Sequence, residues 1–332
     1  MDITVAVVTF NAAKHIRNCL ESLMNLAPHS GALELLVVDG CSTDGTQKIV
    51  GEFKPRIRLV ENPGRTIASN RNVALAEARH PYIAFTDADC IVQPTWIEVL
   101  EKAMTYSLRT DETTAGVGGG NIPPESATPF SEALGIAIGS FLGSLGSVQG
   151  KVFSEKRRVA SLAGLNVLYK KQALLEMGGF DEMLANMNED TDINRRLTKK
   201  GYSLWYVPGA EVRHAVRPGL GAWCRAMFAY GDGRGRIMRK HRTLFSPAYA
   251  GALLFIPIMT AATAGAPAHP WLLLVWLYVP LMFAAAALVS FKKNIIAAGI
   301  VGLILIGTHF CYAAGLWRGL LKGYPRSRPR NN

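Results

Sequence analysis

The N-terminal part of the chain alternates short apolar runs with segments whose apolar residues recur every three or four positions. Uninterrupted runs rich in Val and Ile are typical of strands buried on both faces, and the three-to-four spacing is typical of amphipathic helices. This alternation predicts an α/β fold with a mainly parallel, doubly wound sheet and right-handed crossovers. We expect its strands at residues 3–10, 33–38 and 57–60 and in the run from Tyr82 to Asp89.

Long apolar segments follow in the C-terminal part of the chain. Each is about as long as the ~20 residues that cross a bilayer, and Trp271 and Trp317 stand where interfacial anchors are expected. A buried helix of a soluble protein is the alternative interpretation. We therefore predict a catalytic domain at residues 1–240 and a membrane domain at 241–332. The apolar segments of the membrane domain are 248–266, 271–289 and 295–317.

The charge pattern leaves the topology of these segments open. Three full spans would place the Arg-rich tail opposite the N-terminal domain, against the tendency of basic residues to stay in the cytoplasm. Pro257 and Gly265 make the first segment the weakest, and a re-entrant or interfacial segment there would return the tail to the cytoplasm. A shorter, glycine-cut apolar stretch at 133–148 is expected to lie at the membrane interface or to pack on the sheet.

The 332 residues are 49% hydrophobic and carry a formal net charge of +11. Eight Lys or Arg face one acid between Arg213 and Arg242, and more follow in the tail. Because these clusters adjoin apolar segments, we expect membrane lipids as partners and no nucleic acid. Five scattered cysteines favour reduced thiols. No basic segment precedes the first apolar run, so we expect no signal peptide and a cytoplasmic N-terminal domain.

Carboxylates stand at the ends of two predicted strands. Asp87 and Asp89 are one residue apart where the fourth strand ends, and open parallel sheets place their ligands at such ends. A divalent cation such as Mg²⁺ or Mn²⁺ would relieve their repulsion and could bind phosphates. Asp39 ends the second strand and could accept a hydrogen bond from a base or ribose. The alternatives are that Asp39 and Asp87 cap the elements that follow them and that Asp89 is solvated.

Three further acids, Glu189, Asp190 and Asp192, crowd the start of a predicted helix, where the macrodipole favours negative charge. Capping explains one or two of them. A carboxylate here could act as a general base towards an acceptor hydroxyl. Arg71, on the helix after Gly64, could reach the same crevice, although a solvated arginine is the commoner case.

Several motifs in this order make the chain similar to a family 2 glycosyltransferase with the GT-A fold, over about residues 3–240. The matching pieces are Val7-Val8-Thr9-Phe10-Asn11, Val37-Val38-Asp39-Gly40-Cys41-Ser42-Thr43-Asp44-Gly45-Thr46, Ala68-Ser69-Asn70-Arg71-Asn72, Thr86-Asp87-Ala88-Asp89, Gly119-Gly120-Asn121, Gly178-Gly179-Phe180-Asp181-Glu182 and Glu189-Asp190-Thr191-Asp192. The resemblance implies a nucleotide-sugar donor, with a UDP-sugar expected, and a divalent metal as cofactor.

The resemblance also implies roles on the donor side. Thr9 and Asp39 would contact the nucleotide, with Arg71 alongside. Asp87 and Asp89 would engage the diphosphate as the metal-site carboxylates, Asp89 through the metal.

On the acceptor side, the resemblance implies that Asp190 is the base of an inverting displacement, with Glu189 as the next candidate. His214 follows a predicted strand, as in many relatives, and would approach the metal or the diphosphate. The alternative is a structural histidine.

The chain lacks the Q-x-x-R-W motif that processive synthases of the family carry before their last spans, so polymer translocation is not expected. It resembles instead the succinoglycan ExoA-like enzymes that extend lipid-linked repeat units. The resemblance implies a multi-pass enzyme of the cell (inner) membrane that works on the cytoplasmic face, with a polyprenyl-diphosphate-linked glycan as acceptor. The alternatives are a polyprenyl-phosphate glycosyltransferase and, in another class, a transporter with a nucleotide-responsive domain.

Overall fold

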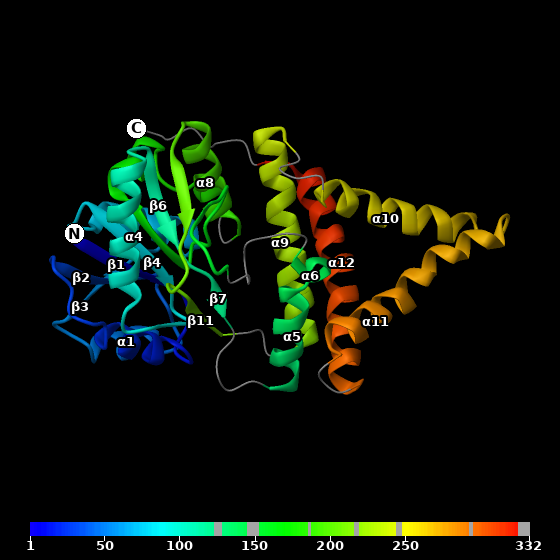
Figure 1. Cartoon of the computed structure of the whole chain (residues 1–332), viewed down its shortest axis with the longest axis horizontal. Coiled ribbons are helices and arrows are strands. Elements are labelled where there is room, and N and C mark those ends of the chain that lie inside the picture. Colours follow the sequence, from blue (N-terminus) through cyan, green and yellow to red (C-terminus); the bar gives the residue numbers. More distant parts are fainter. Residues whose placement is uncertain are drawn as a thin grey trace. The chain divides into compact units, whose positions relative to one another are not determined.

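The computed structural model describes residues 1–122, 128–144, 153–184, 187–215, 219–243, 248–291 and 295–324. The chain forms two compact units (Figure 1). The first, Met1–Ile122 with Val148–Ala215, contains the strands, and the second, Pro123–Ser147 with Val216–Asn332, is helical where it is described.

Four parallel strands form one half of the main sheet, in the order β3-β2-β1-β4. They are β1 (Ile3–Thr9), β2 (Leu33–Asp39), β3 (Ile57–Glu61) and β4 (Tyr82–Asp87). The chain moves outward from β1 to β3 and then returns to the other side of β1 to form β4, so the strand order reverses beside β1. The predicted mainly parallel α/β sheet is confirmed.

Antiparallel pairing enters in the other half of the sheet. Strand β9 (Asn166–Lys170) lies between β4 and β6 (Thr114–Gly118) and runs opposite to both. Strand β10 (Ser203–Tyr206) is parallel to β6, and the short β8 (Arg157–Arg158) closes this edge. Because β9 is antiparallel to both of its neighbours, β4 and β6 point in the same direction.

A second, three-stranded sheet has the order β5-β11-β7. Its strands are β5 (Cys90–Val92), β11 (Val212–His214) and β7 (Asn121–Ile122). Strand β5 begins three residues after β4 ends, so this small sheet continues from the carboxyl end of β4. It brings β11 beside Asp89.

Helices cover both faces of the main sheet, as strands without a polar face require. Alternate residues of β1 enter different cores: Val5 and Val7 pack in one cluster and Ala6 in the other. The first cluster includes residues of α1 (Ile16–Met24), α2 (Thr46–Gly51) and α4 (Trp96–Thr110). The second includes residues of α3 (Ile67–Glu77), α7 (Lys171–Glu176) and α8 (Glu189–Lys199). A short helix, η1 (Glu182–Leu184), precedes α8.

The second unit contains α5 (Pro129–Gly139), α6 (Phe141–Ser144), α9 (Leu220–His241), α10 (Ala248–Gly265), η2 (Pro270–Leu277), α11 (Tyr278–Val289) and α12 (Ile295–Lys322). Within the described residues, Pro270–Val289 and Ile295–Lys322 are long and apolar enough to cross a membrane, and Tyr249–Gly265 is a shorter apolar helix.

Two sequence predictions concern the limits of these parts. The stretch predicted at 133–148 falls on α5 and α6, and its last four residues lie outside the described residues. Helix α9 belongs to the second compact unit, whereas the predicted domain boundary lies after residue 240, near the end of this helix. Both the interfacial role of 133–148 and the domain assignment stay predictions.

Candidate active site

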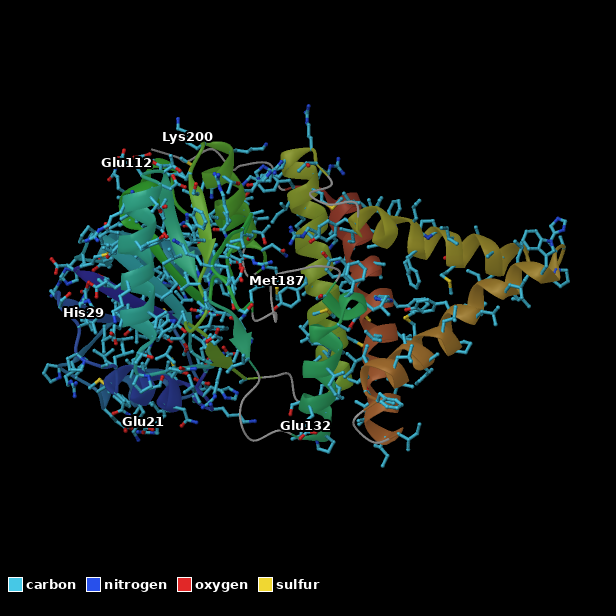
Figure 2. All side chains as sticks on the ribbon, in the orientation of Figure 1. Glu21, His29, Glu112, Glu132, Met187 and Lys200 are labelled. Carbon is cyan, nitrogen blue, oxygen red and sulfur yellow. The ribbon has the colours of Figure 1, made fainter. Side chains whose placement is uncertain are left out.

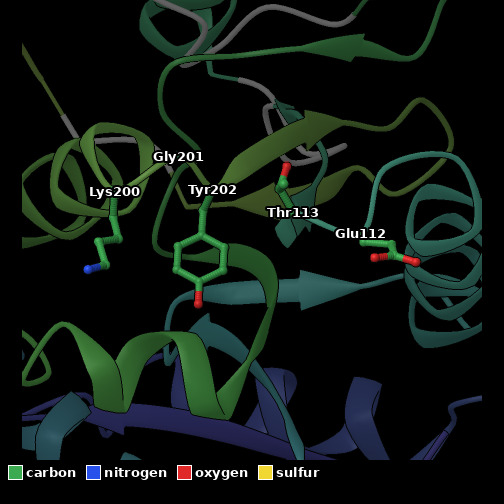
Figure 3. Close-up of a pocket in the computed structure, with 5 residues that line it drawn as sticks. All are labelled: Glu112, Thr113, Lys200, Gly201 and Tyr202. Atoms are coloured by element: carbon green, nitrogen blue, oxygen red, sulfur yellow. The ribbon is translucent and has the colours of Figure 1, made fainter.

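The carboxyl ends of β1, β2 and β4 meet at one edge of the sheet. Thr9 lies opposite Asp39, and Val8 lies opposite Asp87. This edge adjoins the point where the strand order reverses, which is where open α/β sheets bind ligands. A small hollow lies instead at the amino ends of β6 and β10, on the opposite edge of the sheet (Figure 3). It is lined by Glu112, Thr113, Lys200, Gly201 and Tyr202.

Asp39 is fully buried at the end of β2 and holds the turn that follows. One carboxylate oxygen accepts hydrogen bonds from the Ser42 backbone N–H and from Gln47 Nε2, both at 2.8 Å, and the other accepts from the Ser42 hydroxyl at 2.6 Å. The neighbouring Thr9 is also buried, and its hydroxyl has no hydrogen-bond partner among the described residues. Buried polar atoms rarely stay unpaired, so this hydroxyl is a candidate contact for a ligand.

Arg71 joins two of the predicted carboxylates. Its guanidinium donates to Glu189 Oε1 at 2.6 Å and to Asp87 Oδ1 at 3.3 Å. The side chain is only 3% exposed. Burial lowers the pKa of Arg71, but the charges of Glu189 and Asp87 outweigh this effect and raise it above its usual value. The arginine is therefore a fixed buried cation and not a solvated surface residue.

Aromatic rings hold this cation in place. The guanidinium carbon lies 5.7 Å from the ring centres of both Phe85 and Phe180. Asn72 fixes Phe180 in turn, because its Nδ2 donates to the Phe180 carbonyl at 2.9 Å and its Oδ1 accepts from the Phe180 N–H at 2.7 Å. A Cβ added to Gly164 would collide with the Arg71 guanidinium. Four of the sequence motifs thus meet around Arg71: its own and those that contain Asp87, Phe180 and Glu189.

Asp89 and His214 meet through the small sheet. Strand β11 pairs antiparallel with β5 so that His214 lies opposite Cys90. His214 Nε2 is 3.3 Å from Asp89 Oδ2, and one ligand atom from each of Asp89, Cys90 and His214 lies within 4.8 Å of the others. The histidine that sequence analysis placed near the diphosphate site therefore contacts one of the two aspartates.

The donor atoms at this point suit a divalent cation. The Asp89 and His214 side chains are each 26% exposed, and carboxylate and imidazole together can hold Mn²⁺ or Mg²⁺. The Cys90 thiol is buried, and burial raises its pKa well above the usual value, which disfavours the thiolate form. Asp87 is not part of this group. Burial raises the pKa of Asp87, and Arg71 opposes this shift.

The three acids at the start of α8 have different surroundings. Glu189 is buried, and burial raises its pKa to about 7, with Arg71 opposing the shift and Asp190 adding to it. Asp192 is fully buried and accepts a hydrogen bond from Arg196 Nε at 2.8 Å. Asp190 stays partly exposed; its Oδ2 accepts from the Gly164 N–H at 3.0 Å and its Oδ1 from the Thr191 N–H at 2.6 Å. Of the three, Asp190 is the carboxylate within reach of a ligand.

Sequence reasoning did not identify several residues that shape this site. Cys90 had one signal, its position directly after Asp89. Phe180 and Asn72 lie inside motifs that were recognised, but nothing in the sequence indicated that they contact each other. Nothing in the sequence pointed to Gly164, because its role depends on the position of the Arg71 guanidinium in the folded chain.

Comparisons with known proteins show the family to which the chain belongs. The family models described as "Glycosyl transferase family 2" and "Glycosyl transferase family group 2" match residues 4–109 and 82–310. The succinoglycan biosynthesis protein ExoA of Rhizobium meliloti is 28% identical over 96% of this chain and 94% of its own. The N-acetylglucosaminyl-diphospho-decaprenol L-rhamnosyltransferase of Mycobacterium tuberculosis is 30% identical over 63% of this chain and 75% of its own.

A solved structure supports the fold. The mannosyltransferase PcManGT from Pyrobaculum calidifontis, in complex with GDP-Man and Mn²⁺, superposes with a TM-score of 0.59 at 20% identity, covering 96% of this chain and 87% of that one. The second family model matches more than half of the chain. The predicted resemblance and the prediction of an enzyme are confirmed, and the chain belongs to the family 2 glycosyltransferases.

Proposed function

We propose that this glycosyltransferase moves one sugar, with inversion at the anomeric carbon, from a nucleotide-sugar to a lipid-linked glycan at the cytoplasmic face of the membrane. The observation that carries the proposal is the arrangement around Arg71. One buried cation contacts Asp87 on the side predicted to bind the diphosphate and Glu189 on the side predicted to bind the acceptor. The next partly exposed carboxylates on each side are Asp89 and Asp190.

The donor would bind along the carboxyl ends of β1, β2 and β4. The unpaired Thr9 hydroxyl and the Asp39 turn line the part that would hold the nucleotide, with a UDP-sugar as the first candidate. Asp87 and Arg71 would face the diphosphate. Because Arg71 packs against two phenylalanine rings and donates to two carboxylates, it needs little reorganisation to meet a negative charge.

Asp89 and His214 would hold the divalent cation, Mn²⁺ or Mg²⁺, and Asp87 would complete the site. When bound, such a cation stabilises the charge that develops on a diphosphate leaving group. The support from this chain is the 3.3 Å approach of His214 Nε2 to Asp89 Oδ2. A carboxylate and an imidazole so placed can share one ligand.

Asp190 would be the general base. It would take the proton of the acceptor hydroxyl while the hydroxyl oxygen attacks the anomeric carbon and the nucleoside diphosphate leaves from the opposite face. Two backbone N–H groups orient this carboxylate, and it is more exposed than Glu189. Glu189 is engaged by Arg71 at 2.6 Å and would position that cation.

The acceptor class rests on the relatives and on the second unit. The printed name of the M. tuberculosis relative describes an acceptor that already carries a sugar on a lipid diphosphate. This favours extension of a polyprenyl-diphosphate-linked glycan over glycosylation of a bare polyprenyl phosphate. The apolar helices described in the second unit supply a means of staying at the membrane, where such an acceptor resides.

The test is to incubate membranes containing the full chain with a panel of labelled UDP-, GDP- and dTDP-sugars and then to extract the lipids. We expect label from one donor to enter lipid-linked glycan only when Mn²⁺ or Mg²⁺ is present, with the opposite anomeric configuration to the donor. Transfer that is complete in EDTA, retention of configuration, or label in a bare polyprenyl phosphate would each contradict one part of the proposal.

A further inference from the structure

The backbones of helices α9 and α12 of the second unit lie in direct contact. Gly231 and Gly235 of α9 face Gly315 and Gly319 of α12. A Cβ on Gly231 would collide with the carbonyl oxygen of Tyr312, and Cβ atoms on the other three would collide with backbone carbonyls in the same way. The pairing extends in both directions, because Trp223 Nε1 donates to the Thr308 hydroxyl at 2.8 Å and Arg239 donates to the Leu320 carbonyl at 2.6 Å. Helix α9 therefore accompanies α12 from about Thr308 to Leu320.

The charges of α9 limit where this helix pair can lie. Helix α9 carries five Lys or Arg residues and Asp232, which forms ion pairs with Arg236 at 2.9 Å and with Arg318 of α12 at 3.3 Å. Charged side chains are costly in a bilayer interior, so α9 stays outside the hydrocarbon. Cys224 of α9 already approaches Gly307, and the part of α12 before this glycine, residues 295–306, is about 18 Å long at 1.5 Å per residue. That is shorter than the hydrocarbon core of about 30 Å, so α12 cannot cross the bilayer while it is paired with α9.

The segment between these two helices is very different. Residues 248–291 contain no Asp, Glu, Lys or Arg. Helix α10 leaves α12, and the chain returns to it through η2 and α11, so that the two arms meet far from α12 (Figure 1). Trp317 Nε1 donates to the Leu253 carbonyl at 2.8 Å near the start of this hairpin, and Phe283 packs on Gly302 near its end. Both ends of the hairpin are therefore attached to the same helix.

The surface of the hairpin is apolar and open. Leu254, Leu274 and Leu281 are 58%, 62% and 62% exposed. Figure 2 shows mainly carbon atoms in the side chains along both arms. Basic residues flank the hairpin in the sequence, with Arg239, Lys240 and Arg242 before it and Lys292-Lys293 after it. Anionic head groups complement such flanks, and acyl chains complement the arms.

We propose that the hairpin of residues 248–291 is the membrane-inserted element and that it enters and leaves on the same face, while α9, α12 and the basic tail stay on that face. No apolar segment of spanning length separates the sheet-containing unit from α9, so that unit is on the same face as well. Lipid acyl chains cover the surface of the hairpin. The inference depends on the proposed function at one point only, which is that the shared face is the cytoplasmic one.

The first experiment determines the sides of the two termini. The full chain carries different epitope tags at its N- and C-termini, and protease is added to inverted and right-side-out vesicles. Cleavage of both tags in the same vesicle orientation is the expected result, whereas tags on opposite sides would overturn the inference. Sugar transfer is assayed in the same vesicles. If the tags lie on opposite sides and sugar transfer persists, the proposed membrane topology is wrong and the proposed function still stands.

The second experiment identifies what covers the hairpin. Lipids brominated along the acyl chain quench tryptophan that lies in the hydrocarbon, and Trp271 and Trp276 lie on the hairpin. We expect quenching of the wild type and loss of most of it in the Trp271→Phe/Trp276→Phe variant. Trp205→Phe, in strand β10 of the other unit, is the matched control and should leave the quenching unchanged. Absence of quenching in the wild type, as when a second copy of the chain covers the hairpin, would overturn the inference.

Discussion

Replacement of Asp190 by Asn tests the assignment of the base most directly, because it removes a proton acceptor without changing the shape of the side chain. Loss of general base catalysis is expected to lower turnover by ~10²-fold or more, which corresponds to about 3 kcal/mol in the activation barrier. Asn presents one acceptor oxygen, whereas Asp190 accepts from two backbone N–H groups. Leaving one of these N–H groups unpaired costs about 1–3 kcal/mol, and a fall of several degrees in melting temperature follows.

Glu189→Gln is the matched control, one residue away. Gln keeps the oxygen that accepts from Arg71, loses the charge and carries an NH2 group in place of the second oxygen. Because burial raises the pKa of Glu189 well above that of an ordinary carboxyl, neutralising this side chain is less costly than neutralising an exposed one. We therefore expect the melting temperature of E189Q to stay within about 2 °C of the wild type and its turnover to stay within about fivefold.

The assay measures transfer of labelled sugar into extracted lipid at saturating donor, with thermal melting in detergent as the record of folding. Donor binding is followed as the rise in melting temperature that the nucleotide and Mn²⁺ together produce. Asp190→Asn should keep this rise while turnover falls. The reasoning is wrong if Glu189→Gln is the inactive variant and Asp190→Asn the active one, or if both lose turnover equally without loss of stability.

Four other perturbations follow from the same geometry. Arg71→Met leaves the carboxylates of Glu189 and Asp87 without their buried cation and should lower the stability by about 3–5 kcal/mol, a fall of about 10 °C in melting temperature. Adding Glu189→Gln should restore part of the lost stability, and a double variant no more stable than R71M would contradict this. The raised pKa of Glu189 gives a contribution to stability that is fully present below the unfolded pKa of 4.5 and is lost as the pH rises through about 7. The melting temperature of the wild type should therefore fall progressively relative to that of E189Q between pH 5 and pH 8. A difference that stays constant over this range would refute the pKa shift. Asp89→Asn should abolish transfer with an unchanged circular dichroism spectrum, and His214→Ala should raise the Mn²⁺ concentration needed for half-maximal activity by about 10–100-fold; full activity of either variant at low Mn²⁺ would count against the metal site. Replacing Arg239, Lys240 and Arg242 with Gln removes about 1 kcal/mol of attraction each to an anionic surface, so transfer should weaken more in anionic vesicles than in detergent, and equal losses in both would argue against it.

The half of the sheet that carries Asp39 and Asp87 could be predicted because its determinants are local. Strand β1 is buried along its whole length, and seven residues without a polar face can only lie between two layers of helices. Once the strands are parallel, their carboxyl ends share an edge. The proximity of Asp39 to Asp87 then follows without knowledge of any side-chain contact.

The rest of the site depends on pairings that leave no local pattern. His214 reaches Asp89 because two three-residue strands, β5 and β11, pair across more than a hundred residues of sequence. Strands so short have no periodicity to detect. The antiparallel insertion of β9 between β4 and β6 is another pairing without a local pattern. The pairing of α9 with α12 is a third, because the need for glycine at Gly231 and Gly315 becomes visible only when the two helices lie side by side.

Glu189 and Asp190 show why adjacent residues in one motif can have separate roles. Successive residues of an α-helix point about 100° apart, so two neighbouring carboxylates at a helix start cannot face the same group. The phase of α8 decides which of them faces Arg71. Asn188, just before the helix, has a φ of 64°, in the left-handed region that asparagine tolerates better than most residues, and it sets the direction in which α8 begins. With that phase, Glu189 turns inward to the buried guanidinium and Asp190 turns to the Gly164 backbone at the partly open edge. These different surroundings are the reason for proposing Asp190, and not Glu189, as the base.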